Sequence, residues 1–223
     1  MSDRDVQSVR THDLLEIDAK RFLSCHASAP KWVGESLQRT PFVVVRRGLA
    51  TEQTIPVGVR GVDRNQRWAA ACPLKLVRNI LLPPQLLERP VPKSREDAIP
   101  AFRALNLMKE RWRDIGCPWG PGGSIGFELA AGEQIAKPES DLDLVIYAAE
   151  RITQEMAKSL YAQTLNLLVA VDVRVEAPLC GFSLKEFAWR TPGKILLRTP
   201  SGITLGTDPW GDEVPIPEMC EGG

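Results

Sequence analysis

Hydrophobic positions in the first part of the chain follow a period of two in short stretches. Residues 41–46 form a β-branched run, and apolar and small residues alternate across 54–59. Such alternation places every second side chain on one face, which is typical of a half-buried strand. We therefore predict two strands here, within a small N-terminal α+β lobe that covers residues 1–82.

The pattern changes to a helical period after a proline-rich stretch. Five prolines occur between positions 83 and 100, a density that a helix interior or a central strand does not accommodate. Residues 83–95 are therefore predicted to connect two lobes. From about Glu96 to Ile115 apolar residues recur every three or four positions, which predicts a helix with one buried stripe that ends at Gly116.

Strand and helix patterns then alternate. Strands are predicted over 117–119, 141–147, 169–176, 194–199 and 203–207, and helices over 125–131 and 153–168. This order predicts an α/β (α+β) fold, in which a mixed sheet with flanking helices spans residues 96–206 after the smaller lobe. Residues 207–223 contain five carboxylates, three prolines and no basic residue, which predicts a poorly ordered acidic tail.

Composition narrows the class of protein. Hydrophobic residues make up 43% and charged residues 25%, as in a globular domain. The net charge is zero, so no bulk attraction to nucleic acid or membrane is expected, and we predict neither as a partner. Residues 1–113 nevertheless contain 20 Lys/Arg against 12 Asp/Glu, and residues 114–223 contain 8 against 16. A basic half beside an acidic half suits a polyanionic ligand and a cation.

The cysteines and the apolar runs indicate a compartment. Five cysteines are scattered without a Cys-x-x-Cys pair, so neither a disulfide framework nor a structural zinc site is expected. Reduced thiols are typical of the cytoplasm. No apolar h-region follows the polar first residues, and no apolar run approaches the ~18–20 residues that span a bilayer. We predict a cytoplasmic protein.

Paired carboxylates are the first candidate chemistry. Asp141 and Asp143 lie two apart on a predicted strand, so both would project from one face while Leu142 and Leu144 enter the core. Two converging carboxylates repel each other unless a cation lies between them. Magnesium, or manganese in its place, is held by one or two carboxylates together with substrate phosphates. We therefore predict Mg²⁺ or Mn²⁺ at this pair.

Two further segments would complete such a site. Val171–Glu176 alternates apolar and charged residues, so Asp172 can join the other carboxylates if the two strands are neighbours. A glycine turn precedes the helix at 125–131, where Gly123 and Ser124 would hold phosphate against the helix N-terminus. In the basic half, Arg60, Arg64 and Arg67 are candidates for phosphate or coenzyme contacts; their alternative role is that of solvated surface residues.

This ordered combination resembles the DNA polymerase β-like nucleotidyltransferase superfamily, which implies a nucleotidyltransferase-type mixed sheet. A closer likeness extends over roughly residues 10–210 and rests on six segments: Thr11-His-Asp-Leu-Leu15, Pro56-Val-Gly-Val-Arg-Gly61, Gly123-Ser-Ile-Gly-Phe-Glu-Leu-Ala130, Ser140-Asp-Leu-Asp-Leu144, Val171-Asp-Val173 and Leu196-Leu-Arg-Thr199. Together they resemble the phosphoribosyl-dephospho-CoA transferases of malonate decarboxylase, also called malonate decarboxylase holo-acyl-carrier-protein synthases.

The resemblance implies a reaction and its participants. The prosthetic group of 2′-(5″-triphosphoribosyl)-3′-dephospho-CoA would be transferred to a serine of the malonate decarboxylase acyl carrier subunit, with release of diphosphate. Asp141 and Asp143 match the catalytic aspartates of the family, and Asp172 would be a third metal ligand or the base. Two alternatives stay open: another nucleotidyltransferase of the superfamily that modifies a small molecule or a protein side chain, and a non-catalytic nucleotide- or RNA-binding module.

Overall fold

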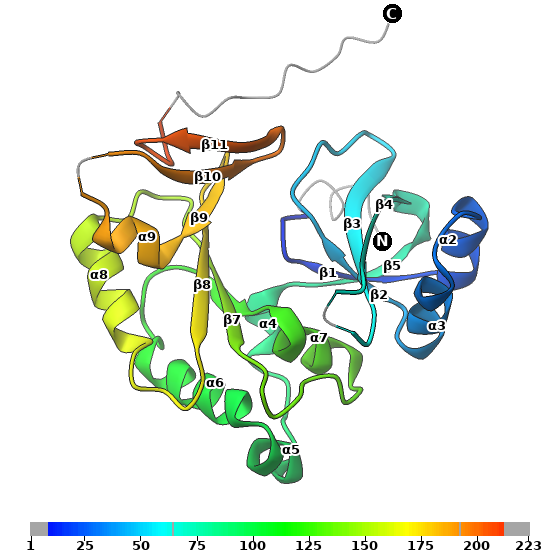
Figure 1. Cartoon of the computed structure of the whole chain (residues 1–223), viewed down its shortest axis with the longest axis horizontal. Helices are drawn as coiled ribbons and strands as arrows, with labels where there is room; N and C mark the ends of the chain where they lie inside the picture. The colour runs from blue at the N-terminus through cyan, green and yellow to red at the C-terminus, as the bar shows by residue number, and fades with distance from the viewer. Residues whose placement is uncertain (1–8, 64, 192, 212–223) are drawn as a thin grey trace, which may run out of the picture.

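The computed structural model of the chain describes residues 9–63, 65–191 and 193–211. Within them the chain forms two β-sheets, one in each half, with helices beside both (Figure 1). The predicted α/β (α+β) class with a mixed sheet is confirmed. No helix of this described part is long and apolar enough to cross a membrane.

The N-terminal lobe is a five-stranded antiparallel sheet with two short helices. Its strands run in the order β4-β3-β2-β1-β5, and its elements are β1 (Leu14–Ile17), α2 (Ala19–Cys25), α3 (Lys31–Arg39), β2 (Phe42–Val45), β3 (Thr54–Arg60), β4 (Arg67–Pro73), the 3-10 helix η1 (Leu74–Leu76) and β5 (Val77–Leu81). Alternate residues of β3 are buried, as its pattern predicts. They pack with Phe22 of α2 and Leu37 of α3 in one cluster.

Three of these strands carry too little pattern to be predicted. β1 has four residues, three of them buried, and β4 exposes every second residue around small alanines. The N-terminal sheet therefore has five strands where the periodicity indicates two.

The proline-rich segment that is predicted to connect the lobes contains two short helices. α4 (Pro83–Leu86) starts at a proline, and α5 (Lys93–Ala98) follows one. Proline is tolerated in the first turn because its missing N–H would have no intrahelical partner there. Pro100 likewise starts α6 (Pro100–Arg111), so the long helix expected over 96–115 is two helices, and the second ends before Gly116.

The second lobe contains the mixed sheet. Its strands run in the order β11-β10-β9-β8-β7-β6, and its elements are β6 (Trp119–Pro121), α7 (Gly123–Ala131), β7 (Leu142–Tyr147), α8 (Gln154–Gln163), β8 (Val171–Glu176), β9 (Gly181–Ser183), α9 (Leu184–Trp189), β10 (Ile195–Thr199) and β11 (Gly202–Gly206). β7 and β8 are parallel and joined through α8, and the other pairs are antiparallel. The sequence misses β9 and α9.

The two lobes share apolar and polar contacts. Leu14 and Phe42 of the N-terminal sheet belong to the core of the second lobe, where the Phe42 ring packs edge-on against Phe127 at 6.4 Å between centroids. The Tyr147 hydroxyl donates to the Thr11 carbonyl at 3.0 Å. These contacts fix one end of the first sheet against the second.

The start of the predicted acidic tail is packed. Trp210 contacts the rings of Phe182 and Phe187, and Asp208 forms an ion pair with Arg151 at 2.6 Å. Residues 207–211 thus differ from the prediction of poor order, and residues 212–223 lie outside the described residues.

Candidate active site

The parallel strands β7 and β8 bring two predicted carboxylates together. Asp143 and Asp172 are directly paired across the ladder, so both side chains leave the same face of the sheet. Asp141 stands one residue before β7 and two before Asp143. The expectation that Asp143 and Asp172 lie on neighbouring strands is confirmed.

Other charged side chains share that face. Alternation along β8 places Arg174 and Glu176 with Asp172, and Glu176 is paired through Gly181 of β9 with Arg198 of β10. We call Asp143, Asp172, Arg174, Glu176 and Arg198 together the charged face.

The glycine turn lies directly against Asp143. The Gly122 amide donates to the Asp143 carbonyl at 2.9 Å, and Gly123, with φ +57°, begins α7. A side chain at Gly123 would overlap the Asp143 carboxylate as well as strain the backbone. The turn therefore brings the free amides of the α7 N-terminus, including that of Ser124, next to the carboxylates.

Arg60 reaches this region from the other lobe. It ends β3, is half-buried, and its positive charge acts on Asp143. Arg67 of β4 is directly paired with Arg60 but is exposed. Arg64 lies outside the described residues. Of the two predicted arginines that the structure describes, Arg60 is therefore the one placed beside the carboxylates.

Electrostatics at Asp143 indicate a crowded anionic site. Burial raises the pKa of Asp143, and the negative charges of Asp141 and Asp172 raise it further. Arg60 and Arg174 act in the opposite direction without cancelling the rise. An additional positive charge would therefore stabilise the ionised site.

Several charged residues near the site were not predicted. Arg174 donates to Asp172 at 2.8 Å, and Glu176 accepts from His12 of the N-terminal lobe at 3.0 Å. Glu176 also forms an ion pair with Arg47. The alternation along Val171–Glu176 put all three β8 side chains on one face, and this was the signal for Arg174 and Glu176. His12 lies in the segment Thr11–Leu15 that carries the family resemblance, but no local pattern places it or Arg47 beside β8.

The carboxylates suit a cation held by two protein ligands. Asp141 adds negative charge beside Asp143, and Asp172 accepts a hydrogen bond from Arg174. In the described ranges, no three His, Cys, Asp or Glu side chains are grouped so as to hold a metal ion by themselves. One or two carboxylates plus substrate phosphates is the usual arrangement for magnesium, so the assignment of Asp141, Asp143 and Asp172 as metal ligands stays a prediction.

A buried ion pair holds the loop that leads to Asp141. Glu128 of α7 accepts from Arg95 of α5 at 2.8 and 2.9 Å, and from the amides of Ile135 and Ala136. Burial alone would raise the pKa of Glu128, but these donors lower it below its usual range. The helix after the glycine turn and the segment before the carboxylates are thus tied together.

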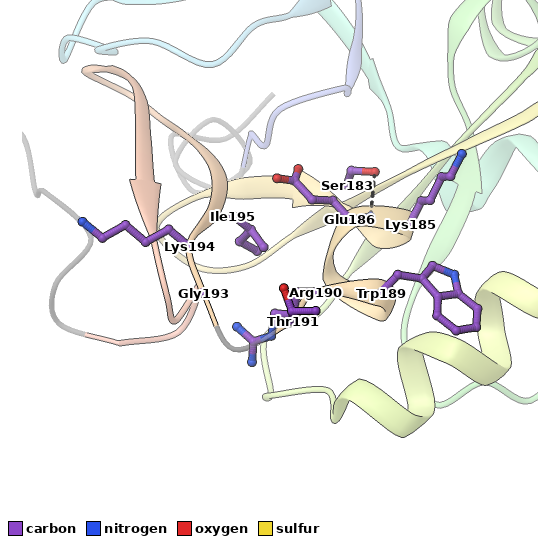
Figure 2. A pocket seen from close by; sticks show the side chains of 9 residues that line it. All are labelled: Ser183, Lys185, Glu186, Trp189, Arg190, Thr191, Gly193, Lys194 and Ile195. Carbon is purple, nitrogen blue, oxygen red and sulfur yellow. Dashed lines mark hydrogen bonds between the residues drawn. The ribbon is translucent and has the colours of Figure 1, made fainter.

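A pocket of about 550 Å³ lies elsewhere, between α9 and the start of β10 (Figure 2). Its lining is formed by Ser183, Lys185, Glu186, Trp189, Arg190, Thr191, Gly193, Lys194 and Ile195. None of the predicted site residues lines it, so it is separate from the carboxylates.

Comparison with known proteins covers both lobes. The N-terminal domain model of the phosphoribosyl-dephospho-CoA transferase MdcG family matches residues 10–83, and the C-terminal domain model matches residues 88–209. No solved structure matches the chain.

Curated relatives carry the same description. A phosphoribosyl-dephospho-CoA transferase of Pseudomonas fluorescens is 34% identical over 84% of this chain and 88% of its own length. The corresponding proteins of Klebsiella pneumoniae strain 342 and Azotobacter vinelandii are 34% and 35% identical, over 92% and 82% of this chain and 97% and 87% of theirs. The chain therefore belongs to the phosphoribosyl-dephospho-CoA transferase MdcG family.

Proposed function

We propose that this protein transfers the phosphoribosyl-dephospho-CoA group from 2′-(5″-triphosphoribosyl)-3′-dephospho-CoA to a serine of the acyl carrier subunit of malonate decarboxylase. The observation that carries the proposal is the family match across both lobes. The close approach of Asp143 and the Gly123 turn supports it, because the turn offers backbone amides to phosphate beside a carboxylate.

The reaction replaces a phosphoanhydride bond of the donor by a phosphodiester linkage to the carrier serine. The serine hydroxyl oxygen attacks the phosphorus atom next to the ribose, a serine O–P bond forms, and the bond to the outer two phosphates breaks. Diphosphate leaves with the electron pair of that bond, and the serine proton passes to a base, for which Asp172 is our candidate. Positioning and charge neutralisation supply most of the catalysis in reactions of this type.

Each part of the site has a role in this scheme. The amides at Gly123 and Ser124 would bind phosphate oxygens, and Arg60 would offset the donor's negative charge. Asp141 and Asp143 would hold Mg²⁺ or Mn²⁺, which when bound supplies positive charge to the phosphate oxygens. Because neutralising one carboxylate also relieves repulsion, Asp143→Asn is expected to stay folded.

The test is the mass of the carrier protein. Purified enzyme, apo carrier subunit and the triphosphoribosyl donor should yield a carrier heavier by one phosphoribosyl-dephospho-CoA group, with one diphosphate released per carrier. ATP in place of the donor should give no product. Modification with ATP but not with the donor would instead support another nucleotidyltransferase, and binding without product in either case would support a non-catalytic module.

A matched pair of variants tests the carboxylates. Asp143→Asn should remove at least ~99.9% of turnover, since removing charge stabilisation at a reacting phosphate costs on the order of 10³-fold. Asp114→Asn, at an exposed position, should leave turnover unchanged. Chelation should abolish activity, and added Mg²⁺ or Mn²⁺ should restore it. Turnover near the wild-type rate in Asp143→Asn, or in the chelated enzyme, would contradict the metal role.

A further inference from the structure

Arg198 lies on the charged face, and its side chain has no hydrogen-bond partner among the described residues. It is paired with Gly181, which is paired in turn with Glu176, so Arg198 and Glu176 stand two strands apart in one row. Gly181 contributes no side chain to that row. A Cβ there would lie 2.5 Å from Glu176 Oε1 and 2.7 Å from Arg47 Nη2, which shows that the row faces the N-terminal lobe.

The neighbouring carboxylates are already engaged. Glu176 binds His12 and Arg47, and Asp172 binds Arg174. Arg198 is half-buried and, among the residues that the structure describes, has no hydrogen-bond or ion-pair partner. Burial lowers the pKa of Arg198, and the positive charge of Arg174 lowers it further. The negative charges of Asp172 and Glu186 act in the opposite direction without cancelling this fall, and the guanidinium remains charged.

A half-buried cation near a second cation is stabilised by an anion that contacts both. Asp172 is hydrogen-bonded to Arg174 and acts on Arg198 only through its charge. The guanidinium fork matches two oxygens of one phosphate, which a lysine ammonium does not do. On the same face, Asp143 and Asp172 mark the place of reaction. The two arginines of the charged face therefore suit phosphate oxygens, whereas the carboxylates Asp141 and Asp143 suit a cation.

We propose that Arg198, assisted by Arg174, binds the outer diphosphate of the donor's triphosphate chain, the part that leaves in the reaction. The assignment of the bound part to the leaving group rests on the proposed function. The class of ligand, an inorganic di- or triphosphate, follows from the two arginines of the charged face.

Arg198 is the better of the two arginines to change. Removing Arg174 would also release Asp172 from its partner and so alter two groups at once. Arg198→Ala leaves no described group without a partner, and Arg198→Lys keeps the charge but loses the fork. Arg103→Ala, at an exposed position of α6, is the matched control.

Calorimetric titration of the full chain with inorganic triphosphate, inorganic diphosphate and 3′-dephospho-CoA tests the proposal without the carrier protein. Arg198→Ala should bind triphosphate and diphosphate about 10- to 150-fold more weakly than the wild type. The affinity of Arg198→Lys for these two ligands should lie between those of Arg198→Ala and the wild type, and that of Arg103→Ala should match the wild type. The affinity for 3′-dephospho-CoA should be unchanged in all three variants.

Several results would overturn the inference. These are unchanged triphosphate affinity in Arg198→Ala, no triphosphate binding by the wild type, and a loss confined to 3′-dephospho-CoA, which would place the coenzyme's own diphosphate at this site. If Arg198→Ala does not fold, Arg198→Lys decides by the same comparison. If the wild type fails to modify the carrier while Arg198→Ala still loses triphosphate binding, the proposed function is wrong and the phosphate site stands.

Discussion

Two arginines of the second lobe, Arg95 and Arg198, differ in what surrounds their charge. The Arg95 guanidinium donates three hydrogen bonds, two to Glu128 and one to the Ala136 carbonyl. Arg198 donates none to the described residues. The Glu128 hydrogen bonds raise the pKa of Arg95, whereas burial lowers that of Arg198.

The difference separates scaffold from site. An arginine whose guanidinium is held by a carboxylate and a carbonyl of its own chain stabilises the fold and has fewer donors left to offer a ligand. A half-buried charge without partners costs free energy in the empty protein and is retained where a ligand repays that cost. Arg95 therefore positions the loop before Asp141, and Arg198 is available to bind.

The scaffold pair should give the largest effect on folding. Glu128→Ala leaves the half-buried Arg95 without its carboxylate partner and leaves the amides of Ile135 and Ala136 without their acceptor. Breaking one side of a buried pair costs about 3–5 kcal/mol. Urea denaturation should show this loss of unfolding free energy, while Glu133→Ala, in the exposed loop nearby, should change it by less than about 0.5 kcal/mol. A loss in Glu128→Ala as small as the control's would contradict the scaffold role.

The second largest effect should be on the donor KM, and it should differ between two paired arginines of the first lobe. Arg60→Ala removes the cation that acts on Asp143, and one charge-assisted hydrogen bond to phosphate is worth about 1.5–3 kcal/mol. The donor KM should therefore rise about 10- to 150-fold, with kcat changed much less. Arg67→Ala, at the exposed partner position, should raise the donor KM less than Arg60→Ala does.

Steady-state kinetics with each substrate titrated separately decides between donor and carrier. The effect of Arg60→Ala should shrink as salt rises, because ions screen the same attraction in the wild type. A carrier KM that rises while the donor KM stays constant would show that Arg60 contacts the carrier protein instead.

Sequence periodicity predicts the second lobe better than the first. The run from Val171 to Glu176 alternates strictly, and the strand observed there keeps both the predicted face and its neighbour β7. In the first lobe, β1 and β5 are short and their burial depends on the partner strands, so no local pattern identifies them. Pro100 lies inside the helix predicted over 96–115, whereas in the structure it begins α6, because the first helical turn accepts a proline.

The site divides in the same way. Asp143, Asp172 and Gly123 belong to motifs of one lobe, and the order of these motifs predicts that the three residues lie close together. Arg198 and His12 reach the site only through the order of strands and the docking of the lobes. Their contribution depends on long-range pairing that the sequence alone does not specify.

The smallest expected effect concerns two titratable groups near the junction of the lobes, Asp13 and His12. Asp13 is fully buried and accepts from the Arg10 amide at 2.8 Å and, more weakly, from the Tyr147 hydroxyl at 3.4 Å. Burial raises the pKa of Asp13 to about 6. Burial, with the charges of Arg47 and Arg174, lowers the pKa of His12 to about 4.

These two shifts act on stability with opposite signs. Because Asp13 binds its proton more tightly in the folded state, its contribution is fully present below pH 4 and is lost as pH rises through about 6. His12 binds its proton less tightly when folded, so its contribution is present above pH 6.5 and is lost as pH falls through about 4. Between pH 6 and 5 each changes the unfolding free energy by about 1 kcal/mol, and the two nearly cancel.

Removing either group should reveal the effect of the other group on the pH dependence of stability. On acidification from pH 6 to 5, Asp13→Asn should lose about 1 kcal/mol more unfolding free energy than the wild type does, and His12→Gln about 1 kcal/mol less. Urea denaturation at both pH values measures the two slopes, and the slope is insensitive to any constant loss that a substitution causes. The double variant should return to the shallow wild-type slope. Parallel slopes in all four proteins would show that neither group changes its proton affinity on folding, and that the junction between the lobes is more hydrated than the burial of Asp13 indicates.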